Sequence, residues 1–307
     1  GRMDPEDYTD TNWQRVLTEY ENGRYAISIA APNPKSDSVS DINKAVQDTI
    51  YAALNDAISR MNSIPMKRIK KANIVVSLDA QTLGLGYLIK PTCVTVDEST
   101  QASKVITDLI KQAVKARFGE DLEGHQEYHA GEPTEKYAYI HTGTIEDSFY
   151  LAEVYWPEQG EATVAEYITD KSGPIPASKY ATDRAGNYLG EFDYYSMSGW
   201  MYSVAETGKN EDGTFSELSA PSFPGVGAAQ WRMRDGEIMR WQFTVYGYGA
   251  DLNADNSAWG QGSITGNSGD KTELTYEIAM MREAYKNSST EMSYEAGDDK
   301  LETSRIY

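Results

Sequence analysis

Two of the chain's three histidines lie close together in the run 125–129, which reads His-Gln-Glu-Tyr-His. Zinc hydrolases use a related pattern, His-Glu-x-x-His, because both imidazoles then share one helix face with the Glu beside the metal-bound water. Here the Glu comes one position late, and Gly124 and Gly131 stand on either side as helix breakers. The spacing of His125 and His129 therefore favours a solvated loop over a zinc site.

Oxygen-bearing side chains recur at every second position from Asp251 through Asn253 and Asp255 to Ser257. This is the spacing of the first ligands of a calcium-binding loop, but the last ligand of such a loop is a bidentate Glu, and Gly262 stands there. Few histidines are available as a base, and no Gly-x-Ser-x-Gly nucleophile elbow occurs. We therefore expect a noncatalytic protein that requires no metal and no cofactor.

Large aromatic side chains are the remaining candidates for a binding site. They alternate with other residues in runs typical of β-strands, where every second side chain points to the same face. Half of such a set must point into the core, where large aromatics pack well. The pattern alone leaves open whether the rings form a core or a binding face. The set consists of Trp200, Tyr202, Trp231, Trp241, Tyr246 and Tyr248.

The bulk composition excludes some classes of partner. With 28 Lys and Arg against 47 Asp and Glu, the net charge is -19, so the surface repels nucleic acids and anionic membranes. No run approaches the ~18 apolar residues of a membrane helix, and we expect no membrane insertion of this segment. The sequence shows no signal peptide. From its start at Gly1 we expect that a leader has been removed before this residue. Cys93 is the one cysteine, so no internal disulfide is possible, and we expect its thiol to lie buried in a strand. The composition, with 22 Tyr and 6 Phe, is typical of an exported bacterial protein.

Hydrophobic spacing predicts the elements of the N-terminal part. A short helix is expected around 13–20 and a strand at 25–29. The clearest element is a helix at 39–61, in which apolar residues recur at helical spacing behind Ser38 or Ser40 as N-cap. We expect this helix to pack on the rest of the protein.

Two strands are expected next, at 72–78 and 93–96. Gly84 and Gly86 lie between them and resemble part of a dinucleotide-binding loop. The third glycine and the helix that such a loop requires are absent, so we do not expect a nucleotide site there.

The stretch 119–187 reads as an insertion with one clear strand, at 149–156. Further along, residues 231–234 and 237–245 form two alternating runs on either side of Asp235-Gly236. This dipeptide supplies the positive φ that a tight turn needs, so the pattern predicts a β-hairpin.

A C-terminal helix is expected at 271–286. Asp270 and Glu273 have the spacing of a capping box at its start. Apolar residues recur along one face of this helix, at Leu274, Ile278, Met281 and Tyr285. The residues that follow are polar and read as a tail.

The middle of the chain carries a combination of short motifs. The first motif is Tyr188-Leu189, which comes before a strand that begins near Trp200. A glycine-rich loop follows, with Trp231 four residues after Gly227, and the turn then reads Asp235-Gly236-Glu237. Earlier, 94–100 reads as a strand and acidic turn before a short helix. In this combination, over roughly 72–250, the chain resembles the C-terminal domain of transcobalamin and intrinsic factor, and more closely the transcobalamin-like C-terminal family of exported bacterial proteins.

The resemblance implies an α+β fold. It would consist of a β-grasp-like domain of the transcobalamin C-terminal type at 72–250, with an N-terminal extension at 1–71, the insertion at 119–187 and a C-terminal part at 251–307. In transcobalamin the Trp-bearing strand and the loop before the turn lie against the corrin ring. The matching residues, which the resemblance implies as ligand-binding, are Trp200, Tyr202, Phe223, Gly225, Val226 and Gly227.

The function that the resemblance implies is an extracellular or cell-surface module that binds a small molecule, with a corrinoid such as cobalamin as its ligand. The alternative is a structural or adhesive surface module whose partner is another surface protein. A concave pocket lined by Trp200 and the loop around Phe223 would favour the small-molecule function. A flat exposed patch would favour the structural or adhesive function.

Overall fold

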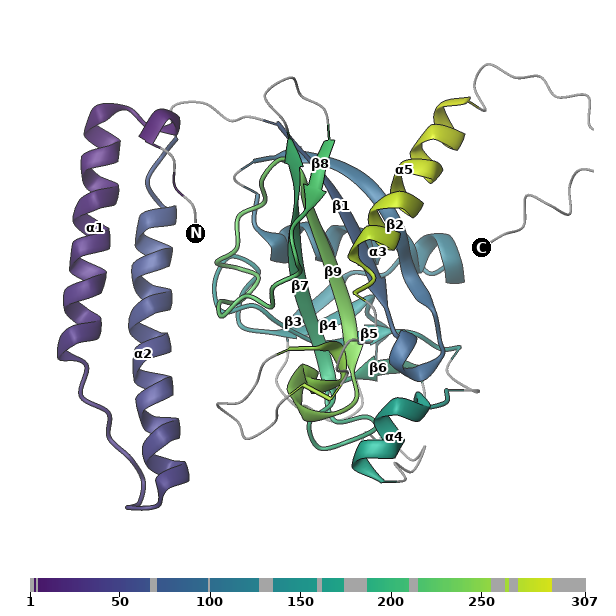
Figure 1. Cartoon of the computed structure of the whole chain (residues 1–307), viewed down its shortest axis with the longest axis horizontal. Helices are drawn as coiled ribbons and strands as arrows, with labels where there is room; N and C mark the ends of the chain where they lie inside the picture. The colour runs from purple at the N-terminus through teal and green to yellow at the C-terminus, as the bar shows by residue number, and fades with distance from the viewer. Residues whose placement is uncertain are drawn as a thin grey trace, which may run out of the picture.

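The computed structural model describes residues 3, 5–66, 71–98, 100–126, 135–158, 162–173, 187–209, 215–254, 263–264 and 270–288. Within this part, a hairpin of two long helices stands beside a body of two β-sheets and further helices (Figure 1). The mixture of helices and mixed sheets confirms the expected α+β class. None of the helices in these described ranges is long and apolar enough to cross a membrane.

The hairpin consists of α1 (Asp10–Ile29) and α2 (Val39–Asn62). Both helices begin at a side-chain cap, since Thr9 Oγ1 accepts from Asn12 N and Ser38 Oγ accepts from Asp41 N. The helix expected at 39–61 is thus confirmed, with Ser38 as its cap.

The strand expected at 25–29 is wrong, because these residues form the last turns of α1. In isolation their alternation resembles a strand. However, Ile27 follows Val16, Tyr20 and Gly23 at helical spacing and extends their stripe. Gly23 lies directly against Ala57 of α2, so the two helices approach closely at that point.

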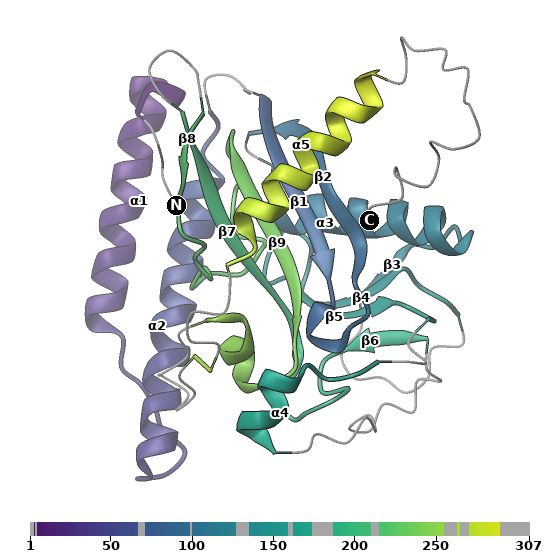
Figure 2. The same cartoon turned by 45° about the vertical axis from the view of Figure 1, so that its right-hand side comes forward.

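A five-stranded sheet forms the centre of the body, in the order β2-β1-β9-β7-β8 (Figure 2). β1 and β9 are parallel, and all other neighbours in this sheet are antiparallel. β9 is buried along its whole length because β1 and β7 cover both of its edges. The strands are β1 (Lys71–Asp79), β2 (Tyr87–Asp97), β7 (Gly199–Lys209), β8 (Phe215–Leu218) and β9 (Glu237–Thr244). The strands expected at 72–78 and 93–96 lie within β1 and β2.

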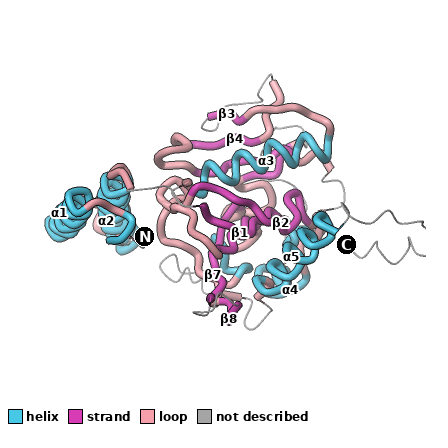
Figure 3. The backbone as a smooth tube through the Cα atoms, turned by 90° about the horizontal axis from the view of Figure 1, so that it is seen from above, coloured by secondary structure: helices cyan, strands magenta, loops and turns pink. Residues whose placement is uncertain are grey.

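One face of this sheet carries the main core. The helix α3 (Ala102–Phe118) lies between the five-stranded sheet and a second, four-stranded sheet (Figure 3). Side chains from all three layers are fully buried together, among them Leu78, Ile110 and Leu151. This layer holds most of the apolar surface that the body buries.

The stretch 119–187 supplies most of the second sheet, whose order is β3-β4-β5-β6. The strand expected at 149–156 is confirmed as β5. A short helix, α4 (Glu166–Ser172), follows it in the sequence. The strands of this sheet are β3 (Gly124–Gln126), β4 (Tyr139–Thr142), β5 (Tyr150–Tyr155) and β6 (Tyr188–Gly190).

The other face of the five-stranded sheet is covered by α5 (Thr272–Ser288). This helix is the one expected at 271–286, and Asp270 Oδ1 accepts from Thr272 N at its start. Thr275 and Ala279 are buried on its sheet side, where Tyr276 and Met280 are partly buried beside them. Of the apolar stripe expected on this helix, Leu274, Met281 and Tyr285 are exposed and Ile278 is half-buried.

The β-hairpin expected across Asp235-Gly236 is wrong, although the turn itself exists. Gly236 has φ +84°, as a tight turn requires. Residues 231–234 do not pair with β9, because both edges of β9 are taken; Arg232 forms a bridge to Gln101 instead. The Asp235 carboxylate accepts from the backbone N of Asn73 at 2.8 Å, which ties the turn to β1.

Candidate ligand-binding cavity

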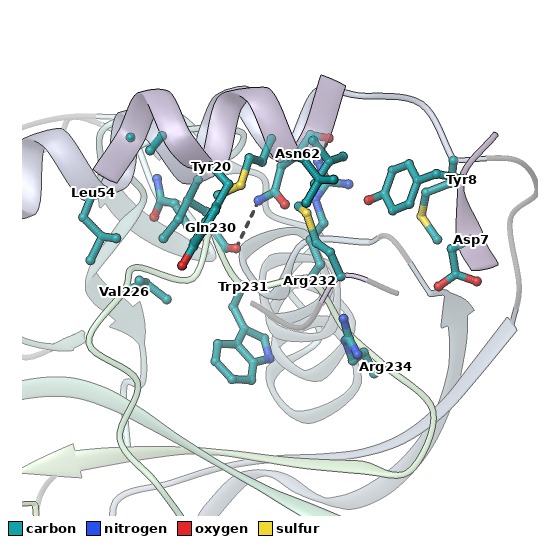
Figure 4. Close-up of a pocket in the computed structure, with 18 of the residues that line it drawn as sticks. Asp7, Tyr8, Tyr20, Leu54, Asn62, Val226, Gln230, Trp231, Arg232 and Arg234 are labelled. Carbon is teal, nitrogen blue, oxygen red and sulfur yellow. Dashed lines mark hydrogen bonds between the residues drawn. The ribbon is translucent and has the colours of Figure 1, made fainter. Parts of the chain in front are cut away.

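A cavity of about 640 Å³ lies between the α1–α2 hairpin and the loop 226–236 of the body (Figure 4). The helices supply one wall, from which Leu54 and Asn62 of α2 reach the cavity, and the loop supplies the opposite wall. Most of the lining is apolar or aromatic, including Tyr8, Trp13, Tyr20, Leu54, Met61 and Trp231. The cavity therefore exists only because the hairpin stands next to the body.

Two hydrogen bonds hold the end of α2 against the loop. Asn62 Nδ2 donates to the backbone O of Gln230 at 3.3 Å, and Arg232 Nη2 donates to the backbone O of Asn62 at 2.8 Å. Arg232 thereby satisfies a carbonyl in the last turn of the helix, where a cation also interacts well with the helix dipole. These contacts fix the width of the cavity at this end.

Polar side chains of both charges gather at the same end (Figure 4). Tyr8, Arg232 and Arg234 line it together with Asp7. Glu98 also lines the cavity. Burial raises the pKa of the Tyr8 hydroxyl, and the nearby charge of Arg232 opposes this shift. Burial also lowers the pKa of Arg232. This end offers hydrogen-bond donors and acceptors side by side.

Glu237 lines the cavity at the start of β9 and is only 2% exposed. Its Oε2 accepts from the backbone N of Arg234 at 3.0 Å and from Trp231 Nε1 at 3.4 Å. Burial raises the pKa of Glu237 to about 7. The two hydrogen bonds oppose this rise, whereas the negative charge of Glu206, which pairs with Glu237 from β7, adds to it. The charge of this carboxyl therefore changes near neutral pH.

The lining is chemically suited to holding a molecule. Among the described residues that line it there is no His, Cys, Ser, Thr or Lys, and so no side chain of the usual nucleophiles or of an imidazole base. The apolar walls can exclude water from a ligand, and the polar end can fix its orientation.

Neither Trp200 nor Tyr202 lines this cavity, and both pack in the core. Trp200 is 4% exposed, its Nε1 donates to Leu189 O at 2.9 Å, and its ring meets Phe243 edge-on. No ligand can reach this indole in the structure as it stands. Tyr202 stacks on Trp241 at 5.1 Å, and burial raises the pKa of its hydroxyl.

The predicted loop residues are split between the cavity and the surface. Val226 lines the cavity, and its backbone O accepts from Tyr202 Oη at 2.8 Å. Phe223 and Gly227 are half-buried and Gly225 is exposed, but none of the three lines the cavity. Of the six residues that the family resemblance implied, the structure places only Val226 at the candidate site.

The two metal motifs do not assemble a ligand set in the part of the chain that the structure describes, where no group of three or more His, Cys, Asp or Glu could hold an ion. His125 stacks on Tyr137 at 4.2 Å. The Asp251 carboxylate accepts from Thr244 Oγ1 and from the backbone N of Val245 and Tyr246. His129, Asp255 and Ser257 lie outside the described residues.

The sequence interpretation missed the N-terminal contribution to the cavity. Tyr8 and Trp13 lie before or at the start of α1, and the strand prediction for 25–29 concealed how far this helix extends. The signal was the helical spacing of Val16, Tyr20 and Ile27, all of which line the cavity.

No known protein family matches this chain by its family model, and no curated protein is similar enough to identify it.

Proposed function

We propose that this protein is a noncatalytic binding module that holds a largely apolar small molecule in the cavity between the helical hairpin and the body. The observation that carries the proposal is the cavity itself, with its aromatic walls and the polar end formed by Tyr8, Arg232 and Arg234. Cavities of about 300–1,000 Å³ with such walls are typical of sites for drug-sized ligands.

The polar end favours a ligand whose polar groups both donate and accept hydrogen bonds. Arg232 and Arg234 would bond carbonyl oxygens, while Asp7 would bond N–H groups. Amides meet both demands without a net charge. A corrinoid, an apolar disc fringed with amides, is the first ligand to test, and a cavity of this size would take only part of it.

We further propose that the body is a β-grasp-like domain of the transcobalamin C-terminal type. In a β-grasp, a β-hairpin leads into a helix, and the first and last strands lie parallel at the centre of a mixed sheet. Three features support this proposal: the β1–β2 hairpin precedes α3, β1 is parallel to β9, and β7 and β8 extend the sheet beyond β9. An extracellular or cell-surface location is proposed on the composition of the chain.

A second candidate function is adhesion to another surface protein, and the far end of the helical hairpin favours it. Tyr25 and Ile29 at the end of α1 are 66% and 60% exposed, and Val39 at the start of α2 is 74% exposed. Apolar side chains exposed together in this way mark protein contacts.

Titration with cobalamin, and separately with an uncharged apolar amide dye, tests the small-molecule proposal. Trp13 and Trp231 both line the cavity, so tryptophan fluorescence should report saturable binding. Leu54→Glu places a charge on the apolar wall and should weaken binding at least about tenfold, equal to ~1.4 kcal/mol.

Phe223→Ala is the matched control, because Phe223 belongs to the predicted loop but lies outside the cavity. If Phe223→Ala weakens binding and Leu54→Glu does not, the ligand occupies the loop face instead. If a folded protein binds neither probe at millimolar concentration, the adhesive function becomes the better proposal.

A further inference from the structure

The helix α5 lies on the sheet with one face and carries exposed apolar side chains on another. Thr275 and Ala279 are fully buried on the sheet. On the opposite side, Leu274, Met281 and Tyr285 are 54%, 61% and 71% exposed. Figure 2 shows α5 lying across the outer side of the five-stranded sheet, so this second face points away from the body.

These three exposed residues, together with the half-buried Ile278, follow the spacing of a coiled-coil seam. Leu274, Ile278, Met281 and Tyr285 are separated by four, three and four positions, which is the alternation of d and a positions in a heptad. Ile278 then occupies an a position and Leu274 a d position. In parallel coiled coils, Ile at a with Leu at d favours two strands.

Charged residues on either side of the seam favour the same arrangement. In this register Glu277 is at a g position and Arg282 at the following e position. In a parallel pair each g residue meets the next e residue of the other helix, so Glu277 would meet Arg282 of a second copy, twice by symmetry. In an antiparallel pair with the seams aligned, residue 274 lies opposite 285 and g meets g, so Glu277 would lie beside Ala284 of the second copy and this ion pair would be lost.

We propose that α5 is the contact through which two copies of this chain pair, with their α5 helices parallel about a two-fold axis. Each helix is already ordered on its own sheet, so pairing does not require the cost of forming it. The seam spans only two heptads, and the dimer should therefore dissociate in the micromolar range. This proposal does not depend on the ligand cavity.

Sedimentation velocity over about 1–200 μM tests for the dimer on the whole chain. We expect a monomer–dimer equilibrium for the unchanged protein. Met281→Glu puts a charge into the seam and should raise the dissociation constant at least about tenfold. Tyr25→Glu is the matched control, because Tyr25 is also an exposed aromatic but lies on α1.

Two further variants test the orientation. Glu277→Arg should weaken the dimer by placing like charges together, and adding Arg282→Glu should restore it. Leu274→Cys, in a chain with Cys93→Ser, should form a disulfide-linked dimer on mild oxidation, because a parallel pair brings the two Leu274 positions together. In an antiparallel pair they would lie roughly 16 Å apart, too far for a disulfide.

If the protein sediments as a monomer at every concentration, the proposal is wrong, and the seam would then contact a different partner. A dimer that Met281→Glu leaves intact, or that Tyr25→Glu disrupts instead, would place the contact elsewhere. A dimer that Met281→Glu weakens but Leu274→Cys does not cross-link would overturn the parallel arrangement. Circular dichroism and thermal melting of each variant show whether it is folded.

Discussion

Glu237 is a titratable side chain in a place that water hardly reaches. Its pKa in the folded protein is about 7, above the value of 4.5 for an unperturbed Glu. The folded state therefore holds this proton more strongly than the unfolded state does. It follows that the side chain lowers stability as pH rises from about 4.5 through 7, since the folded protein must then bury a charge.

We predict that Glu237→Gln stabilises the protein at high pH and has little effect at low pH. Gln keeps an oxygen that can accept from Trp231 Nε1 but carries no charge. The expected gain in the free energy of unfolding is up to about 3 kcal/mol at pH 8 and less than about 1 kcal/mol at pH 5. Thermal melting at both pH values measures it.

Glu21→Gln serves as the control, because Glu21 is an exposed carboxylate on α1. The free energy of unfolding of this variant should equal that of the unchanged protein at both pH values. A Glu237→Gln variant whose gain is the same at pH 5 and pH 8 would show that the carboxyl is already neutral, or already charged, over the whole range.

Individual tryptophans illustrate what the sequence could not decide. Trp200 and Trp231 both open runs of alternating residues, yet one is core and the other lines the cavity. The two indoles differ in their hydrogen-bond partners: Leu189 O accepts from Trp200 Nε1, whereas Glu237 Oε2 accepts from Trp231 Nε1. No local pattern specifies such a partner.

At the scale of elements, the turn before β9 depends on one residue without a side chain. Gly236 has φ +84°, and a Cβ there would contact Thr207 Oγ1 of β7. This turn is also tied to β1 through Asp235. It therefore sets the position at which β9 enters the sheet.

We predict that Gly236→Ala lowers the free energy of unfolding by about 1–3 kcal/mol, from strain at positive φ and from the contact with Thr207. Chemical denaturation measures the loss. Gly225→Ala is the control, because nothing lies within 4 Å of a Cβ at that position and its φ is not positive. Equal stability of the two variants would contradict the role of the turn.

The elements that local spacing specifies were predicted well. The helix at 39–61 and the start of α5 follow from helical periodicity and from Ser38 and Asp270 as caps. The wrong hairpin prediction concerns pairing. The sequence around Asp235-Gly236 is that of a hairpin, but β1 occupies the edge of β9 that a hairpin partner would need. Such competition between distant segments has no local signature.

At the scale of the whole molecule, the net charge of -19 means that the excess carboxylates on the surface repel one another. Surface ion pairs such as Lys115 with Asp121 and Lys136 with Glu120 oppose it. Exposed pairs of this kind contribute roughly 0–1 kcal/mol each, so the general repulsion should dominate.

We predict that added salt raises the melting temperature. Increasing NaCl from about 20 to about 200 mM shortens the screening length to less than ~10 Å and weakens the repulsion between distant carboxylates. A rise of about 2–4 °C, equal to ~1 kcal/mol, is expected for a chain of this size. Scanning calorimetry at low protein concentration, where the chain is monomeric, measures it, and a fall would mean that the ion pairs outweigh the repulsion.

The parallel pairing of β1 with β9 also bears on how the chain folds as it is made. Val75 pairs with Ile238, so the two strands at the centre of the sheet come from opposite ends of the body's sequence. When β1 and β2 have left the ribosome, the central edge of β1 has no neighbour until almost the whole body has been synthesised. Contacts this distant in sequence form slowly, and an uncovered apolar edge can pair with strands of other chains in the meantime. Any chain that ends before β9 would keep that edge open permanently, and aggregation would then compete with folding.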